Sequence, residues 1–174
     1  MAKLITGHHA MHGTTMPQPT STRYGGIARG SEVRTTEGPL PVEYLLVGDS
    51  VVTHSGVQKI THIHQTMIVG PMIGIRSCCL GFERPTQALL LAPQTRVLLR
   101  DWRARVLYGK KSALVPVERL VDDAFIAPIA SVRVQIYTLT LDASAAFYAN
   151  GVEIGTEPMR VTAKAAPLTR RIQA

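Results

Sequence analysis

The chain has 174 residues, of which 45% are hydrophobic and 18% charged, so it should fold as one domain with a sizeable core and not remain disordered. Aromatic residues make up only 5%, so aliphatic side chains must fill that core, and their short runs favour β-structure. The formal net charge is +7, but the 19 Lys and Arg are scattered, whereas nucleic-acid binders usually gather such charge in a stripe or arm.

The first 25 residues are rich in Gly, His, Thr, Pro and Ser and show no clear period. We expect them to form an extended N-terminal arm. They contain no long apolar run that would indicate a secretory signal, and no stretch of the chain reaches the roughly 20 apolar residues of a membrane span. The expected location is therefore cytoplasmic, with export by a non-classical route left open.

A β-rich body is expected over residues 26–157, followed by a C-terminal extension over 158–174. In its first half the pattern predicts a short turn of helix over 41–46 and several strands, over 32–36, 50–53, 57–68 and 73–79. The last strand would carry the two cysteines, Cys78 and Cys79. Their side chains should point to opposite faces and not pair.

The second half of the body continues this alternation of short strands and turns. It predicts strands over 88–91, 96–99 and 132–141, a hairpin of 103–108 with 112–115 turned at Gly109-Lys110, and a short helix over 117–120. A closing hairpin of 145–149 with 152–154 surrounds Asn150-Gly151, the strongest hairpin signal in the chain. The predicted fold class is all-β.

Four segments of the body, in this order, resemble the Hint (hedgehog/intein) superfamily, especially its bacterial stand-alone branch. They are Gly30-Ser31-Glu32-Val33-Arg34-Thr35 with Gly38, Pro41-Val42-Glu43, Leu46, Gly48-Asp49 and Val52-Thr53; Leu91-Ala92-Pro93-Gln94-Thr95-Arg96-Val97-Leu98-Leu99; Leu114-Val115-Pro116-Val117 with Leu120-Val121-Asp122; and Phe147-Tyr148-Ala149-Asn150-Gly151-Val152. The resemblance covers about residues 26–157. It implies a horseshoe-like β-fold with extended arms at both ends.

The chemistry that the resemblance implies is an acyl shift. A Cys or Ser at the start of the domain attacks the preceding peptide carbonyl, while a Thr and a His on the central strand polarise that bond. Here the family positions are occupied by other residues: Gly26 for the nucleophile, Ala92 and Thr95 on the central strand, Ser144 for a further His, and Gly155-Thr156 for a terminal His-Asn. All six histidines lie within the first 64 residues, so none can fill these positions.

These substitutions lead us to expect a degenerate Hint domain, a pseudoenzyme acting as a non-enzymatic accessory subunit in protein assembly. Its partner would be a larger protein complex or a second copy of the chain, and no cofactor is expected. One alternative is a residual self-cleaving or acyl-transfer domain using Ser31, Thr95 or Cys78 and Cys79. Another is a basic module that binds nucleic acid or an anionic surface.

A few residues are candidates for binding. Trp102, the only Trp, lies between Arg100 and Arg103 and could anchor a partner. Arg170 and Arg171 are candidates in the C-terminal extension. His62 and His64 share one face of an expected strand and are a weak candidate metal or pH-sensing pair, although this pattern is more often the polar face of an exposed strand.

Overall fold

The computed structural model describes residues 24–80 and 84–156. The expected N-terminal arm up to residue 23 and the expected C-terminal extension, with Arg170 and Arg171, lie outside the described residues. The fold is all-β, as predicted, with one seven-residue α-helix and two 3-10 turns. The elements in chain order are β1 (Ile27–Ala28), β2 (Glu32–Thr35), β3 (Gly38–Pro41), η1 (Val42–Tyr44), β4 (Ser50–Thr53), β5 (Gly56–Ile75), β6 (Leu89–Leu91), β7 (Arg96–Leu99), α1 (Trp102–Tyr108), β8 (Ala113–Pro116), η2 (Val117–Leu120), β9 (Ile126–Leu141), β10 (Ala146–Ala149) and β11 (Val152–Gly155).

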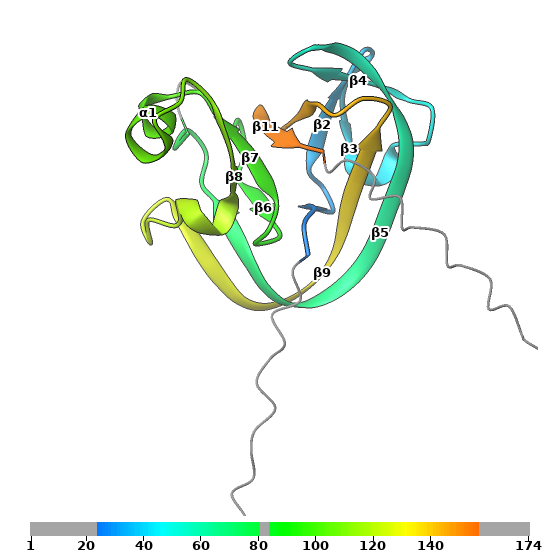
Figure 1. The fold of residues 1–174 in the computed structure, drawn as a ribbon. Helices are drawn as coiled ribbons and strands as arrows, with labels where there is room; N and C mark the ends of the chain where they lie inside the picture. Colours follow the sequence, from blue (N-terminus) through cyan, green and yellow to red (C-terminus); the bar gives the residue numbers. More distant parts are fainter. Residues whose placement is uncertain (1–23, 81–83, 157–174) are drawn as a thin grey trace, which may run out of the picture.

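Two long antiparallel strands, β5 and β9, curve together beneath the rest of the molecule and give it a horseshoe-like outline (Figure 1). The prediction of two separate strands over 57–68 and 73–79 is wrong, because β5 runs unbroken from Gly56 to Ile75. A shift of register between Gly70 and Met72 accommodates Pro71, which has no N–H for the ladder. The irregularity bends the strand without ending it.

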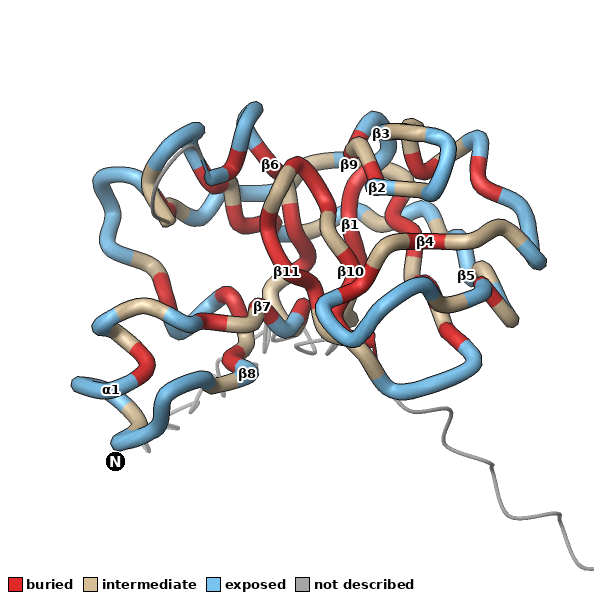
Figure 2. The backbone as a smooth tube through the Cα atoms, turned by 90° about the horizontal axis from the view of Figure 1, so that it is seen from above, coloured by how far each residue is buried: buried red, intermediate tan, exposed pale blue. Residues whose placement is uncertain are grey.

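The two sides of the horseshoe, called its arms from here on and distinct from the terminal arms expected from the sequence, carry different strands (Figure 1). One arm holds β2, β3 and β4, and the other holds β6, β7, β8 and α1. The β10–β11 hairpin connects them, since β10 pairs with β2 and β4 while β11 pairs with β7. Buried residues gather along these central strands, and exposed ones occupy the turns and α1 (Figure 2). The core is mainly aliphatic, as expected.

The predicted hairpin of 103–108 with 112–115 is wrong in its first half, which is the helix α1. The Asp101 side chain accepts a hydrogen bond from the Arg103 N–H at 3.0 Å and so caps the helix N-terminus. Gly109 ends the helix in a left-handed conformation (φ 63°), with its N–H bonded to the carbonyl of Arg105. These caps at both ends favour a helix over the expected strand.

The two cysteines do not lie on a strand either. They follow the end of β5, and Cys78 has a φ of 61°, which turns the chain out of the extended conformation. Cys78 is exposed, Cys79 is half-buried, and both are free thiols. The expectation that strand alternation separates their side chains therefore does not apply.

The short strands β1 and β3 were not expected from the sequence, whereas several other short elements agree with it. The turns of helix expected over 41–46 and 117–120 are η1 and η2. Asn150 and Gly151 both have positive φ, 45° and 81°, and join β10 to β11 in a tight turn. The Asn150 side chain accepts from the Glu32 N–H at 2.7 Å, which ties this hairpin to β2.

Candidate active site at the Gly25–Gly26 peptide

The segment that enters the body at residue 24 passes between two distant parts of the chain. Strand β1 pairs with β6 through Ile27 and Leu91, and with β9 through Ile27 and Tyr137. Gly25 and Gly26 therefore lie in a cleft of about 590 Å³ between the arms. Its other lining residues are Ile27, Gln94, Thr95, Arg96, Pro116, Tyr137, Thr138, Leu139, Phe147, Ile154 and Gly155.

The Thr95 hydroxyl contacts both backbone groups of Gly26. It accepts a hydrogen bond from the Gly26 N–H at 2.9 Å and donates to the Gly26 carbonyl at 2.8 Å. The Ala92 N–H also donates to that carbonyl, at 3.0 Å. Thr95 is buried, and its own N–H donates to the Ala92 carbonyl, so the turn before β7 fixes its position.

A second hydroxyl holds the other side of the same peptide. Thr138, on β9, donates to the Gly25 carbonyl at 2.9 Å. The Gly25–Gly26 peptide thus has a donor at its carbonyl oxygen and a hydroxyl oxygen at its N–H. Donors placed where negative charge develops are the basis of oxyanion stabilisation in acyl-transfer reactions.

The residue before this peptide is also held. The Tyr24 hydroxyl donates to the Pro71 carbonyl on β5 at 2.9 Å, and the Gln94 N–H donates to the Tyr24 carbonyl at 3.3 Å. Partial burial raises the pKa of Tyr24. These contacts restrict the orientation of the peptide between Tyr24 and β1, which lowers the entropic barrier to a reaction there.

Gly26 has no room for a side chain. Its φ of 142° is rare for other residues, and a Cβ would lie 2.8 Å from the Tyr137 carbonyl oxygen and 3.1 Å from Thr138 Oγ1. A Cβ on Gly25 would meet only ordinary contacts, the nearest at 3.7 Å. The position that the resemblance assigns to the nucleophile is therefore shaped for glycine, and the Thr138 hydroxyl lies beside it.

The structure brings four of the family positions together and leaves two outside. Gly26, Thr95 and Gly155 line the cleft, and Ala92 is buried directly beside it. Ser144 is exposed. The Thr156 hydroxyl donates to the Ala145 carbonyl at 2.9 Å and so closes the base of the β10–β11 hairpin.

Three of the four alternative nucleophiles lie elsewhere. The Ser31 hydroxyl donates to the Ala28 carbonyl at 2.7 Å in a buried turn. Cys78 and Cys79 are near Pro85 and Arg103, on the arm that carries α1. Burial raises the pKa of the Cys79 thiol, which disfavours its reactive thiolate. Only Thr95 of this group touches the Gly25–Gly26 peptide.

The predicted binding candidates are divided between two places. Trp102 and Arg103 lie together, with the guanidinium 5.5 Å from the indole centroid. Arg100 instead forms an ion pair with the buried carboxylate of Glu153, at 3.0 Å. The Tyr148 hydroxyl donates to the same carboxylate at 2.9 Å, and burial, then this hydrogen bond, raise the pKa of Tyr148.

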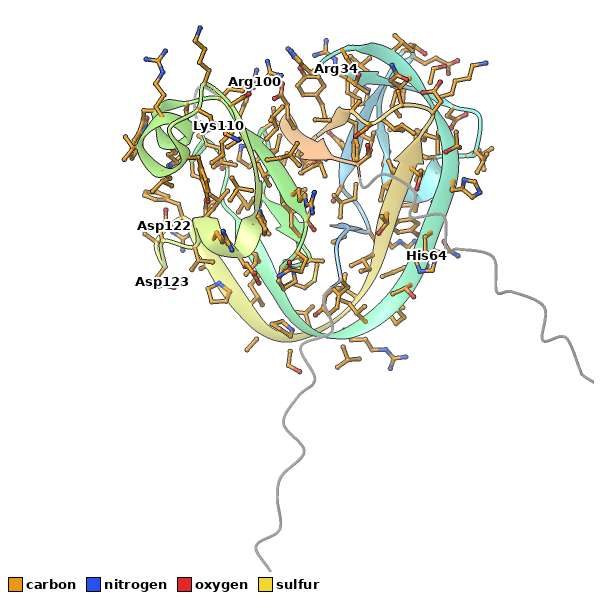
Figure 3. All side chains as sticks on the ribbon, in the orientation of Figure 1. Arg34, His64, Arg100, Lys110, Asp122 and Asp123 are labelled. Carbon is orange, nitrogen blue, oxygen red and sulfur yellow. The ribbon has the colours of Figure 1, made fainter. Side chains whose placement is uncertain are left out.

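His62 and His64 are exposed on β5, opposite Thr140 and Thr138 of β9 (Figure 3 labels His64). They share one face, as expected from strand alternation. Within residues 24–80 and 84–156, no three His, Cys, Asp or Glu side chains gather as a metal site.

Sequence reasoning missed Gly25 and Thr138. Thr138 has the signal that could have identified it, because it is the polar residue in the alternating run of Val132, Val134 and Ile136. Because buried polar groups are nearly always hydrogen-bonded, a hydroxyl on an otherwise apolar strand face predicts a hydrogen-bond partner. Gly25 has no side chain and therefore no comparable signal.

Residues 26–159 match the Hint domain family. The chain belongs to the Hint domain family. Among solved structures, it is similar to a bacterial intein-like domain from Clostridium thermocellum at 12% identity, covering 76% of this chain and 99% of that one, with a TM-score of 0.54. It is also similar to a DnaB intein from Synechocystis sp. PCC 6803 at 12% identity, covering 78% and 100%, with a TM-score of 0.53. No protein of curated function matches the chain.

Family membership corrects one expectation from the sequence. The expectation that this chain is not an enzyme is wrong, because the Hint domain family and the intein-like fold are those of self-cleaving and splicing domains. The substituted positions suggested an inactive scaffold. Residue types alone did not reveal that two threonines contact the peptide bond at the expected point of attack.

Proposed function

We propose that this Hint domain cleaves its own chain by hydrolysis of the Gly25–Gly26 peptide bond. The observation that carries the proposal is the pair of hydroxyls on that bond, with Thr138 on the Gly25 carbonyl oxygen and Thr95 on the Gly26 N–H. The reaction retains the scissile position of the family and replaces the missing side-chain nucleophile with water.

In the proposed reaction, a water molecule adds to the Gly25 carbonyl carbon. The developing oxyanion accepts the hydrogen bond of Thr138, which strengthens as charge builds up. The C–N bond to Gly26 then breaks. At rest the Thr95 hydroxyl accepts from the Gly26 N–H and donates its own proton to the Gly26 carbonyl. In the proposed step the hydroxyl turns that proton to the departing nitrogen and recovers one from the attacking water. The products are a carboxylic acid on Gly25 and an amine on Gly26, and transfer of the acid proton to the amine gives a carboxylate and an ammonium group.

The cleft is compatible with an external nucleophile. Its volume of about 590 Å³ admits water beside Gly25 and Gly26. Neither glycine has a side chain that would block approach to the carbonyl carbon. Threonine hydroxyls are weak proton donors, so we expect a slow reaction that proceeds over hours or days, not seconds.

The experiment is intact mass spectrometry of the purified full chain during incubation. We expect two fragments, one ending at Gly25 and one beginning at Gly26, whose summed mass exceeds the intact mass by one water. A parallel incubation with hydroxylamine separates two routes, because an ester on a threonine hydroxyl would react with it and accelerate cleavage. Direct attack by water predicts no stable ester to capture.

A further inference from the structure

The helix α1 exposes apolar side chains where most soluble surfaces carry polar ones. Trp102 is 65% exposed, Val106 70% and Leu107 56%. Trp102 and Val106 are four residues apart and so share one face of the helix. Ala104 is the residue of α1 that is buried against the body. We call Trp102, Val106 and Leu107 the α1 tip.

Basic residues surround the α1 tip. Residues 100–111 contain Arg100, Arg103, Arg105, Lys110 and Lys111 against one acidic residue, Asp101. Arg100 pairs with Glu153, and Arg103 pairs with Asp101. Arg105, Lys110 and Lys111 are all exposed. None of them forms an ion pair with a described residue. Asp122 and Asp123 lie further down the same arm, away from Lys110 (Figure 3).

The ring of Trp102 is held in place before any partner arrives. Arg103 lies over the indole and also bonds the Asp101 carboxylate and the Cys79 carbonyl. Surfaces that enter the membrane interface combine amphipathic aromatic rings, aliphatic side chains and cations. The α1 tip has this composition, with cations that form no ion pair with a described residue. The helix α1 lies at the outer end of its arm (Figure 1), a position that suits contact with a flat surface better than with a groove.

We propose that the α1 tip binds an anionic lipid surface, with Trp102, Val106 and Leu107 entering the interface and Arg105, Lys110 and Lys111 facing the headgroups. The net charge of +7 adds long-range attraction to such a surface. None of the helices in the described ranges has the length and apolar character of a membrane span, so this contact would be peripheral. The proposal uses no residue of the Gly25–Gly26 cleft and stands apart from self-cleavage.

The test uses Trp102 as its own probe, since the chain has one Trp. Full-length protein is titrated with phosphatidylcholine vesicles that contain phosphatidylserine, and with phosphatidylcholine vesicles alone. We expect the Trp102 emission to move to shorter wavelength with the anionic vesicles only, and the protein to co-sediment with them. We expect added salt to weaken binding, because it screens the cations.

Two matched variants distinguish binding through the α1 tip from attraction of the whole protein to the anionic surface. Val106→Asp should raise the lipid concentration needed for half-maximal binding by about tenfold. Val69→Asp places the same change on a valine of similar exposure, 71%, on β5, and should leave binding unchanged. The proposal is overturned by an absent emission shift with anionic vesicles, by equal weakening in both variants, or by a shift that depends on protein concentration without lipid.

Discussion

The Gly25–Gly26 cleft and the α1 tip differ in where their functional side chains lie, since those of the cleft are buried or half-buried and those of the tip are exposed. In the cleft, Thr95 is buried among aliphatic strands and Thr138 is half-buried. In residues 24–80 and 84–156, no buried side-chain polar atom lacks a hydrogen-bond partner. At the tip, the apolar side chains of Trp102 and Val106 are exposed to solvent, 65% and 70%. The cleft therefore depends on the exact position of two hydroxyls, whereas the tip depends on the composition of one surface.

The largest expected effect comes from removing one of the two hydroxyls that contact the Gly25–Gly26 peptide. Thr138→Val removes the donor on the Gly25 carbonyl with little change in shape, and should slow cleavage by about 10²- to 10³-fold. The measurement is the rate of fragment formation by mass spectrometry. Thr140→Val, two residues along the same strand, is the matched control and should cleave at the normal rate. Equal rates in the two variants would argue against a role for Thr138 in the reaction.

A smaller effect is expected from filling the nucleophile position. Gly26→Ala introduces a Cβ against the Tyr137 carbonyl at a strained φ of 142°, and should lower the free energy of unfolding by about 2–3 kcal/mol. Gly30→Ala has positive φ (84°) but open space around its Cβ, so it should lose only about 1 kcal/mol. Chemical denaturation measures both. The difference between the two losses of unfolding free energy measures the cost of the steric clash at Gly26. Similar losses in the two variants would show that the residues around Gly26 move aside without that cost.

The smallest effect concerns the turn that follows η2 on the α1 arm. The Asp122 carboxylate accepts from the N–H groups of Ala124, Phe125 and Ile126, and the bonds from Ile126 and Phe125 lower the pKa of Asp122 the most. Because the folded pKa lies below the unfolded one, this contribution is present above the unfolded pKa and is lost as pH falls through the folded value. Asp122→Asn should remove about 0.5 kcal/mol at neutral pH, since the side chain is exposed.

The check is unfolding measured between neutral pH and about pH 2, well below the ordinary Asp pKa of about 3.9. The wild-type chain should lose its advantage over Asp122→Asn as the carboxylate is protonated. Asp123→Asn, one residue along, changes a carboxylate that accepts no hydrogen bond from a described residue. It should follow the wild-type curve, and a constant gap between wild type and Asp122→Asn at all pH values would contradict the assignment.

Much of the fold could be predicted from the sequence because its turns have strong local signals. Asn150-Gly151 requires positive φ and thereby fixes the hairpin that connects the arms. The helix α1 was missed because its apolar residues also fit a strand, and the caps at Asp101 and Gly109 decided between the two. The unbroken course of β5 past Pro71 depends on pairing with β9, which local sequence does not contain.

The site was predictable in position but not in chemistry. Gly26 and Thr95 could be placed from the resemblance, and they do meet. What the substituted residues could not reveal is that Thr138, 112 residues from Gly26 along the chain, joins them by strand pairing. A comparison of residue types one position at a time therefore predicted an inactive domain, whereas the arrangement of hydroxyls in space suggests a working one.

The most direct test of the central claim is the intact mass of the wild-type chain and of the double variant Thr95→Val, Thr138→Val after the same long incubation. The account predicts a fragment that begins at Gly26 in the wild type and only the intact mass in the double variant. An intact wild-type chain under all conditions, or cleavage at Gly25–Gly26 that proceeds equally in the double variant, would contradict it.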